Sequence, residues 1–159
     1  SRRNVLKKLS FVVLFALLAG CVSLPKSEQE LRTNHYKIES KCAQTDLFEV
    51  YEIITKNTAR CHGGSEGTIV PAAGSYMALS SEDRIEGLIS KDRTSAKISV
   101  EHINPVAGGF LQLIELQKTE SCPTNIKVYL LNDSTKWKTA TESVFKWLEG
   151  DKDSCFDLM

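Results

Sequence analysis

Cysteine and histidine are the residue types of this chain that could support nucleophilic chemistry. Cys61 precedes His62, and a thiol beside an imidazole is the combination that cysteine nucleophiles use. Adjacent residues on a helix point in different directions, however, so the imidazole of His62 is not expected within hydrogen-bond reach of the thiol. A disulfide explains Cys61 better, and the sequence therefore predicts no catalytic residue and no enzymatic activity.

The other motifs do not predict a metal or cofactor site. His35, His62 and His102 are far apart in the sequence, and neither an HxxxH nor a CxxC spacing occurs. The glycine-rich segment 104–109 is not followed by a helical pattern, and segment 63–67 follows a helical pattern instead of opening one. Neither segment has the context of a phosphate-binding loop. We expect no bound metal and no cofactor.

The residues before Cys21 form the pattern of an export signal. An uncharged apolar run, 11–18, lies between four basic residues and two small ones, namely Arg2, Arg3, Lys7, Lys8, Ala19 and Gly20. A basic head, a short apolar run and small residues at its end are typical of signal peptides. The run is about half as long as the ~20 residues of a membrane-spanning helix. An ordinary secretory signal cut after another small residue is the alternative, but it leaves the position of the cysteine unexplained.

Leu18-Ala19-Gly20-Cys21 resembles the lipobox of bacterial lipoproteins. The resemblance implies diacylation of the Cys21 thiol, cleavage after residue 20 and acylation of the new amino terminus. Several acyl chains make a firm membrane anchor, whereas one chain binds only marginally. Val22 follows the cysteine, and by resemblance to Gram-negative lipoproteins this implies the outer membrane, facing the periplasm, in preference to the inner membrane. Segment 1–7 also resembles the twin-arginine export consensus, although the apolar core favours the general secretory route.

The charge balance limits the kinds of partner. The chain of 159 residues has 20 basic and 20 acidic side chains, and residues 1–20 contain four basic and no acidic ones. Removal of this segment leaves 16 basic and 20 acidic residues, a net charge of −4. A mildly acidic surface argues against binding to nucleic acid and against docking on anionic head groups.

The mature chain is long enough for one domain. Residues 22–43 are mostly polar and bury little in this interpretation, so we expect 21–43 to be the lipidated amino terminus and a tether. A short helix near residues 27–32 is compatible with the capping-box spacing of Ser27 and Glu30. We expect residues 44–159 to form the folded domain.

The periodicity of segment 44–159 predicts an α+β fold. Asp46 caps a helical stripe that extends to Cys61. A second helical stripe, capped by Asp133 or Ser134, ends at Gly150. Between them, five short runs alternate at period two and are separated by turn residues: 76–79, 85–89, 97–103, 110–116 and 126–131. Connections this short predict an antiparallel meander. The expected architecture is helix, five-stranded meander, helix, with both helices on one face of the sheet.

Four apolar residues, Leu131 and three residues of the run 110–116, do not fit a one-sided sheet. Phe110, Ile114 and Leu116 are apolar at positions where we expect the face without helices. An exposed apolar patch of this kind is typical of a binding surface. The sequence therefore predicts that these three residues contact a partner.

Four cysteines remain once Cys21 carries lipid, and an even number in an exported chain favours two disulfides. Cys42–Cys61 is excluded unless the helix breaks, because the helix ends are ~22 Å apart and the four residues before the helix span at most ~13 Å. A bridge needs Cα atoms within ~7 Å. Five intervening strands place the carboxyl ends of both helices together, which predicts Cys61–Cys155 and Cys42–Cys122. Six strands would favour Cys42–Cys155 instead.

These observations predict a non-catalytic, lipid-anchored envelope protein that binds another protein. The layout loosely resembles small bacterial envelope lipoproteins, and an immunity or inhibitor lipoprotein is a specific version of this hypothesis. Two alternatives stay open. One is a carrier of an apolar small molecule between sheet and helices, and the other is a hydrolase whose site the sequence does not reveal.

Overall fold

The structure is a computed structural model that describes residues 23–63, 75–79 and 83–155. The predicted signal peptide and the lipidation site Cys21 lie outside the described residues. The described elements are, in chain order, α2 (Glu28–Asn34), β1 (Lys37–Ala43), α3 (Leu47–Gly63), β2 (Ser75–Leu79), β3 (Asp83–Ile89), β4 (Ser95–His102), β5 (Gly109–Gln117), β6 (Thr124–Leu130) and α4 (Thr135–Leu148). None of these helices is long and apolar enough to cross a membrane.

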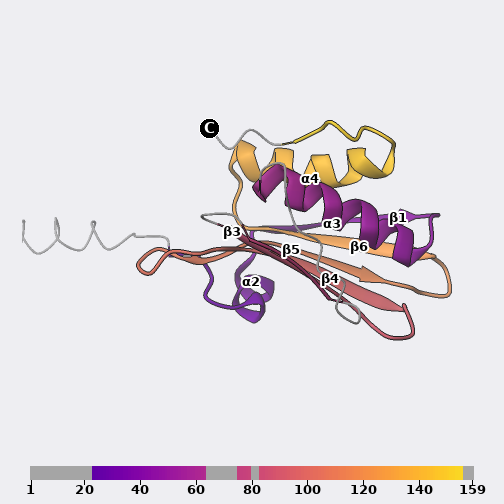
Figure 1. Ribbon diagram of the computed structural model, residues 1–159, viewed down its shortest axis with the longest axis horizontal. Helices are drawn as coiled ribbons and strands as arrows, with labels where there is room; N and C mark the ends of the chain where they lie inside the picture. Colours follow the sequence, from indigo (N-terminus) through magenta and orange to yellow (C-terminus); the bar gives the residue numbers. More distant parts are fainter. Residues whose placement is uncertain (1–22, 64–74, 80–82, 156–159) are drawn as a thin grey trace, which may run out of the picture.

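The α+β fold and the five-stranded meander are confirmed. Strands β2 to β6 pair antiparallel in sequence order between α3 and α4. Figure 1 shows α3 and α4 together on one face of the sheet, as the apolar stripes predict. Asp46 begins α3, since its Oδ1 accepts a hydrogen bond of 2.9 Å from the Phe48 backbone N–H.

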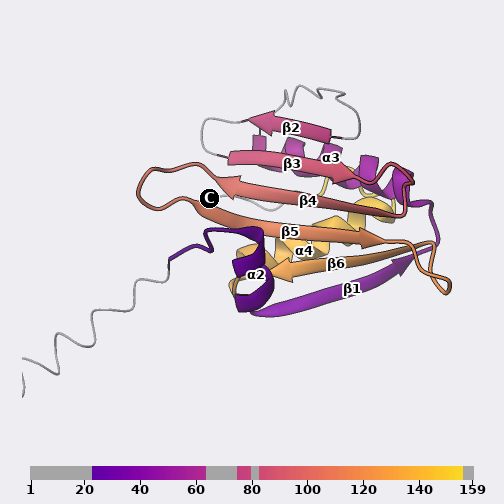
Figure 2. The same cartoon turned by 90° about the horizontal axis from the view of Figure 1, so that it is seen from below.

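The sheet has a further strand in the segment expected to be a tether. Residues 37–43 form β1, which pairs antiparallel with β6, so the order is β1-β6-β5-β4-β3-β2 (Figure 2). The tether prediction for 28–43 is therefore wrong. The strand lacks an apolar alternation because it lies at the edge of the sheet, where only Ile38 and Ala43 join apolar clusters.

The main core lies between the sheet and the pair α3 and α4. Fully buried apolar side chains of α3 face those of the central strands, among them Leu47, Val50, Ile54, Ile85, Ile98, Val100, Ile126 and Val128. The close approach of α3 to β3 depends on Gly87, because a Cβ there would lie 2.7 Å from the hydroxyl oxygen of Tyr51. Ile98 and Val100 face this core, as their alternation with polar neighbours predicts.

Helix α2 covers part of the opposite face. Figures 1 and 2 show it beneath β5 and β6, away from α3 and α4. Leu31 is fully buried in a cluster with Leu113 and Tyr129. The predicted capping interaction forms here, since Ser27 Oγ accepts a 3.0 Å hydrogen bond from the Glu30 backbone N–H. The second face is therefore not bare, and residues 28–43 belong to the folded domain.

Two disulfides join distant parts of the chain. Cys42 pairs with Cys122, linking β1 to the turn before β6, and Cys61 pairs with Cys155, linking the end of α3 to the segment after α4. This is the pairing that the strand count predicts. The five strands of the meander determine it, because β1 precedes α3 and does not change the relative direction of the two helices.

Candidate functional site

The predicted apolar binding patch does not form. Ile114 and Leu116 are 0% and 1% exposed in the core below the helices. Phe110 lies on the other face and packs beside the Leu31 cluster. A bulge in β5 separates Phe110 from Ile114 and Leu116: Val100 pairs with Gln112 and the next residue pairs with Phe110, so that one residue of β5 has no counterpart. The extra residue reverses which side chains face the core, and the prediction of a shared exposed surface is wrong.

A network of charged and polar side chains holds α2 against this second face of the sheet. Arg32 Nε donates to Glu115 Oε1 at 2.7 Å, and the hydroxyl of Tyr129 donates to the other oxygen of Glu115 at 2.8 Å. Burial and the hydrogen bond to Glu115 raise the pKa of Tyr129 to about 12. Lys97 on β4 donates to Glu28 of the helix at 2.6 Å. These contacts fix α2 on the sheet, and they pair charged groups of the sheet with charged groups of the helix.

A hollow of about 790 Å³ lies on this face beside α2. Its lining includes Lys97 and Glu115, whose charges are already paired with α2. The lining also includes the exposed Lys127, apolar side chains such as Leu88 and Ile89, and hydroxyl and amide groups. Two of the three charged side chains of this lining are therefore already engaged by α2.

Cys61 and His62 do not form a pair of nucleophile and general base. Cys61 is oxidised in its disulfide, so it has no thiol to deprotonate. The buried ring of His62 instead faces Asp83, with Nδ1 3.4 Å from Oδ2, and Nδ1 of His102 lies 3.0 Å from Oδ1 of the same carboxylate. Asp83 could not be identified from the sequence, because no spacing connects it to these histidines.

Asp83 joins the end of α3 to the edge of the β3–β4 pair. Burial alone would raise the pKa of Asp83, but the hydrogen bonds with His62 and His102 and their positive charge outweigh burial and lower it. The carboxylate is therefore stabilised in its ionised form. Within the described ranges, no group of three or more histidine, cysteine or acidic side chains could hold a metal ion. We interpret this cluster as a structural link between the helix and the sheet.

The free edge of β1 is a different kind of site. β1 is at one end of the sheet order and pairs with β6 on one side only. An unpaired edge presents a row of backbone N–H and C=O groups that an extended peptide can join. Figure 2 shows β1 along the border of the sheet, with no other described strand outside it.

A hollow of about 500 Å³ lies between this edge and α4. Tyr36, Leu130 and Phe145 supply apolar or aromatic surface to its lining, and Tyr36 is 58% exposed. Nearby, Lys41 bridges the strand and the helix, since its Nζ lies 2.5 Å from Glu149 Oε1 and 5.7 Å from the ring centroid of Phe145. The groove thus combines a free strand edge with an apolar hollow.

Charges of both signs border this β1–α4 groove. Lys37 and Glu39 form an ion pair of 2.5 Å on the strand, and Lys138 and Glu142 are exposed on the helix. Because these charged side chains stand beside the free edge, an added strand either leaves them in contact with water or supplies charges of its own to pair with them. The groove therefore suits an extended segment that brings charges of its own. We take it as the candidate functional site.

No protein-family profile, curated protein or solved structure matches this chain.

Proposed function

We propose that this chain is a lipid-anchored envelope protein that is not an enzyme and acts by binding a protein partner. The anchor is the acylated Cys21, inferred from the residues that precede it. Two disulfides within the described part of the chain support an oxidising compartment, because such bonds persist outside the reducing cytosol. The outer membrane, facing the periplasm, is the proposed location.

The partner site is the β1–α4 groove. The observation that carries this proposal is the free edge of β1 beside the hollow lined by Tyr36, Leu130 and Phe145. In β-strand addition, main-chain hydrogen bonds supply affinity, and every second side chain of the peptide enters a pocket that supplies specificity. The groove matches both requirements, since it has a free strand edge and one apolar pocket beside it.

The groove indicates the chemistry of the partner. The added strand places an aliphatic or aromatic side chain in the hollow and carries acidic and basic residues that can pair with Lys37 and Glu39. A segment of a toxin or of an envelope enzyme meets this description, which keeps the immunity or inhibitor hypothesis within the proposal.

The carrier alternative has less support. A carrier needs a cavity between the sheet and the helices, whereas the described side chains at that interface, such as Ile98, Val128 and Val144, are fully buried against one another. Among the described residues, hollows lie at the sheet face beside α2, at the β1–α4 groove and at the β4–β5 loop. A bound protein segment therefore accounts for the structure better than an enclosed apolar molecule.

Metabolic labelling with a fatty acid tests the anchor. The wild-type chain should incorporate label, and the Cys21→Ala chain should remain unlabelled, uncleaved and easily extracted from membranes. The Cys42→Ala chain is the matched control, because it removes a cysteine that the structure assigns to a disulfide. Equal labelling of wild type and Cys21→Ala would contradict the proposal.

Photo-crosslinking in cells tests the partner site. A photoreactive phenylalanine analogue replaces Tyr36 in one chain and Glu120 in another, and both positions are exposed. We expect a discrete protein adduct from position 36 alone, and its yield should fall when Lys37→Glu and Glu39→Lys are added together. An adduct of the same protein from both positions, or one that the charge exchange leaves unchanged, would remove the groove as the partner site.

A further inference from the structure

The exposed apolar side chains of the described chain gather on one loop. Ile103 and Val106 are 47% and 90% exposed, and both lie in the loop between β4 and β5. Among the residues whose exposure the structure describes, which leave out β2, the only other exposed large apolar side chain is Tyr36, which lies at the groove. The loop segment 103–108 contains no charged residue. Two neighbouring exposed apolar side chains on an uncharged loop form a small apolar patch that can contact an apolar surface.

The loop is held in one conformation by its own hydrogen bonds. Asn104 Oδ1 accepts from the backbone N–H of Val106 and of Ala107, each at 2.9 Å. The carbonyl of Asn104 accepts from the N–H of Gly108 at 3.0 Å. The turn therefore holds Val106 exposed at the tip of the loop. Because the loop is already ordered, it loses no further conformational freedom when Val106 contacts a surface.

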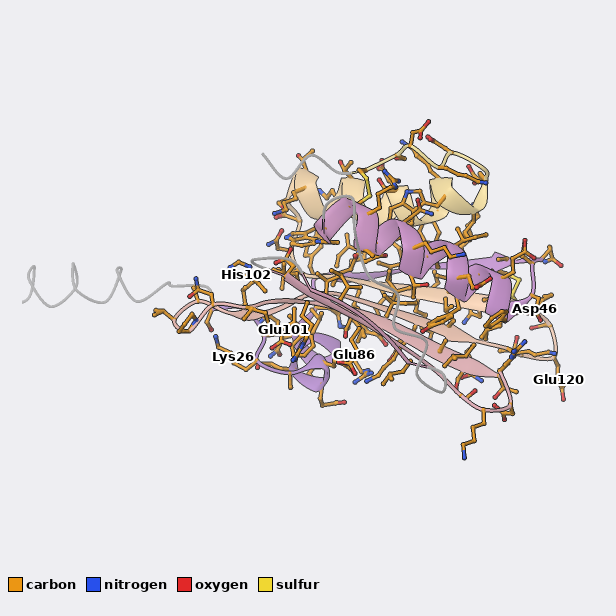
Figure 3. The ribbon with its side chains drawn as sticks, viewed as in Figure 1. Lys26, Asp46, Glu86, Glu101, His102 and Glu120 are labelled. Carbon is orange, nitrogen blue, oxygen red and sulfur yellow. A yellow bond between two sulfur atoms is a disulfide. The ribbon has the colours of Figure 1, made fainter. Side chains whose placement is uncertain are left out.

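The first described residues of the chain dock at the base of this same loop. The carbonyl of Pro25 accepts a 2.8 Å hydrogen bond from the N–H of Phe110, and Lys26 Nζ donates to the carbonyl of Gly108 at 2.5 Å. The approach is close, since a Cβ at Gly109 would lie 2.5 Å from the carbonyl oxygen of Pro25. Figure 3 shows Lys26 and His102 at this end of the sheet, opposite Glu120.

The position of this docked segment limits where Cys21 can be. Ser23 is the first residue that the structure describes, and Cys21 precedes it by two residues. Two residues of fully extended chain span at most ~7 Å. An acyl anchor on Cys21 therefore enters the membrane next to the β4–β5 loop and not at the other end of the sheet.

We propose that the loop 103–108 is a second membrane contact, with Ile103 and Val106 inserted in the lipid interface beside the acylated Cys21. The inference rests on the proposed lipid anchor. Apolar side chains of interfacial segments reach ~5–10 Å into the boundary between head groups and acyl chains. The ammonium of Lys26 then lies at the level of the lipid phosphates. Lipid and loop together hold the domain in one orientation, with the turn that contains Glu120 farthest from the membrane.

Fluorescence of the lipidated full chain tests this contact. The protein is reconstituted in vesicles of phosphatidylethanolamine, with phosphatidylglycerol as the minor lipid, and part of the phosphatidylethanolamine carries brominated acyl chains. Val106→Trp is compared with Glu120→Trp, and wild type gives the background of Trp137 and Trp147, which are both buried. We expect blue-shifted emission from Val106→Trp and quenching by brominated lipid at least about twofold stronger than for Glu120→Trp, given the expected depth of insertion.

Ile103→Trp supplies a second reporter on the same loop, and it should behave like Val106→Trp. Equal quenching of the loop and Glu120 reporters in lipidated protein would overturn the loop contact and leave the anchor intact. A blue shift without quenching by brominated lipid would assign the loop to a protein surface and would also overturn the inference. Absence of fatty acid on wild-type Cys21, measured by mass spectrometry on the same samples, would overturn the anchor itself.

Discussion

Cys61 in the last turn of α3 and Cys155 beyond α4 are joined by a disulfide across 94 residues of sequence. The segment that carries Cys155 is held by further contacts, since Trp147 Nε1 donates to the carbonyl of Ser154 at 2.6 Å and Arg60 donates to the carbonyl of Lys152 at 2.6 Å. The disulfide and these hydrogen bonds together attach the end of the described chain to both helices of the main layer.

Removal of this bond should destabilise the domain. We expect Cys61→Ser with Cys155→Ser to lower the free energy of unfolding by ~2–5 kcal/mol, because the unfolded chain regains the freedom of a long loop. Urea denaturation under non-reducing conditions measures the change. The Cys42→Ser with Cys122→Ser protein, which lacks a bond of comparable span, is the matched comparison. Peptide mapping that joins Cys61 to Cys122 would contradict the pairing.

Helix α2 should contribute to the stability of the domain. Leu31 is fully buried against Leu113 and Tyr129, so Leu31→Ala should lower the free energy of unfolding by ~2–5 kcal/mol. Gln29→Ala on the exposed side of the same helix is the control and should change it by less than ~0.5 kcal/mol. Equal effects of the two substitutions in urea denaturation would argue that residues 28–34 are only a tether.

Asp83 should make stability depend on pH in the acidic range. Its pKa is lower in the folded chain than the ordinary value near 3.9, so its ionised form contributes stability above pH ~4 that is lost as the pH falls through the folded pKa. Asp83→Asn removes this contribution, and at pH 7 we expect it to cost ~1–3 kcal/mol. The difference between wild type and variant should shrink towards pH 3.

Urea denaturation at pH 7 and pH 3 measures that difference. Asp153→Asn, at an exposed position after α4, is the control and should show no comparable change between the two pH values. A gap between wild type and Asp83→Asn that stays constant with pH would show that the histidine contacts of Asp83 do not depend on its charge.

The elements with strong periodicity could be predicted from the sequence. The stripe of α3, the capping residue Asp46 and the five runs of the meander each depend on residues close in the sequence, and each is present within a few residues of its expected bounds. The disulfide pairing followed from the same information, because the number of intervening strands sets the relative direction of two helices. The local sequence pattern was sufficient to predict these elements, because burial of one face imposes a regular spacing of apolar residues on each of them.

Strand β1 could not be predicted in this way. Its residues Lys37, Glu39 and Lys41 read as a polar linker, because an edge strand beside solvent buries few of its side chains. The β-strand conformation comes from backbone pairing with β6, a segment about ninety residues away in the sequence. The free edge that forms the candidate site exists only as a result of that pairing.

The sequence by itself determined the α+β class, the meander and the cysteine pairs, since these depend on periodicity and on the direction of neighbouring elements. Tertiary structure alone decided which apolar residues are exposed. One extra residue in β5 placed Ile114 and Phe110 on opposite faces of the sheet, and long-range pairing brought Pro25 to Phe110. Successive side chains of a strand point to opposite faces of the sheet, so a single bulge exchanges the two faces for every residue beyond it. No local sequence pattern marks the position of this bulge.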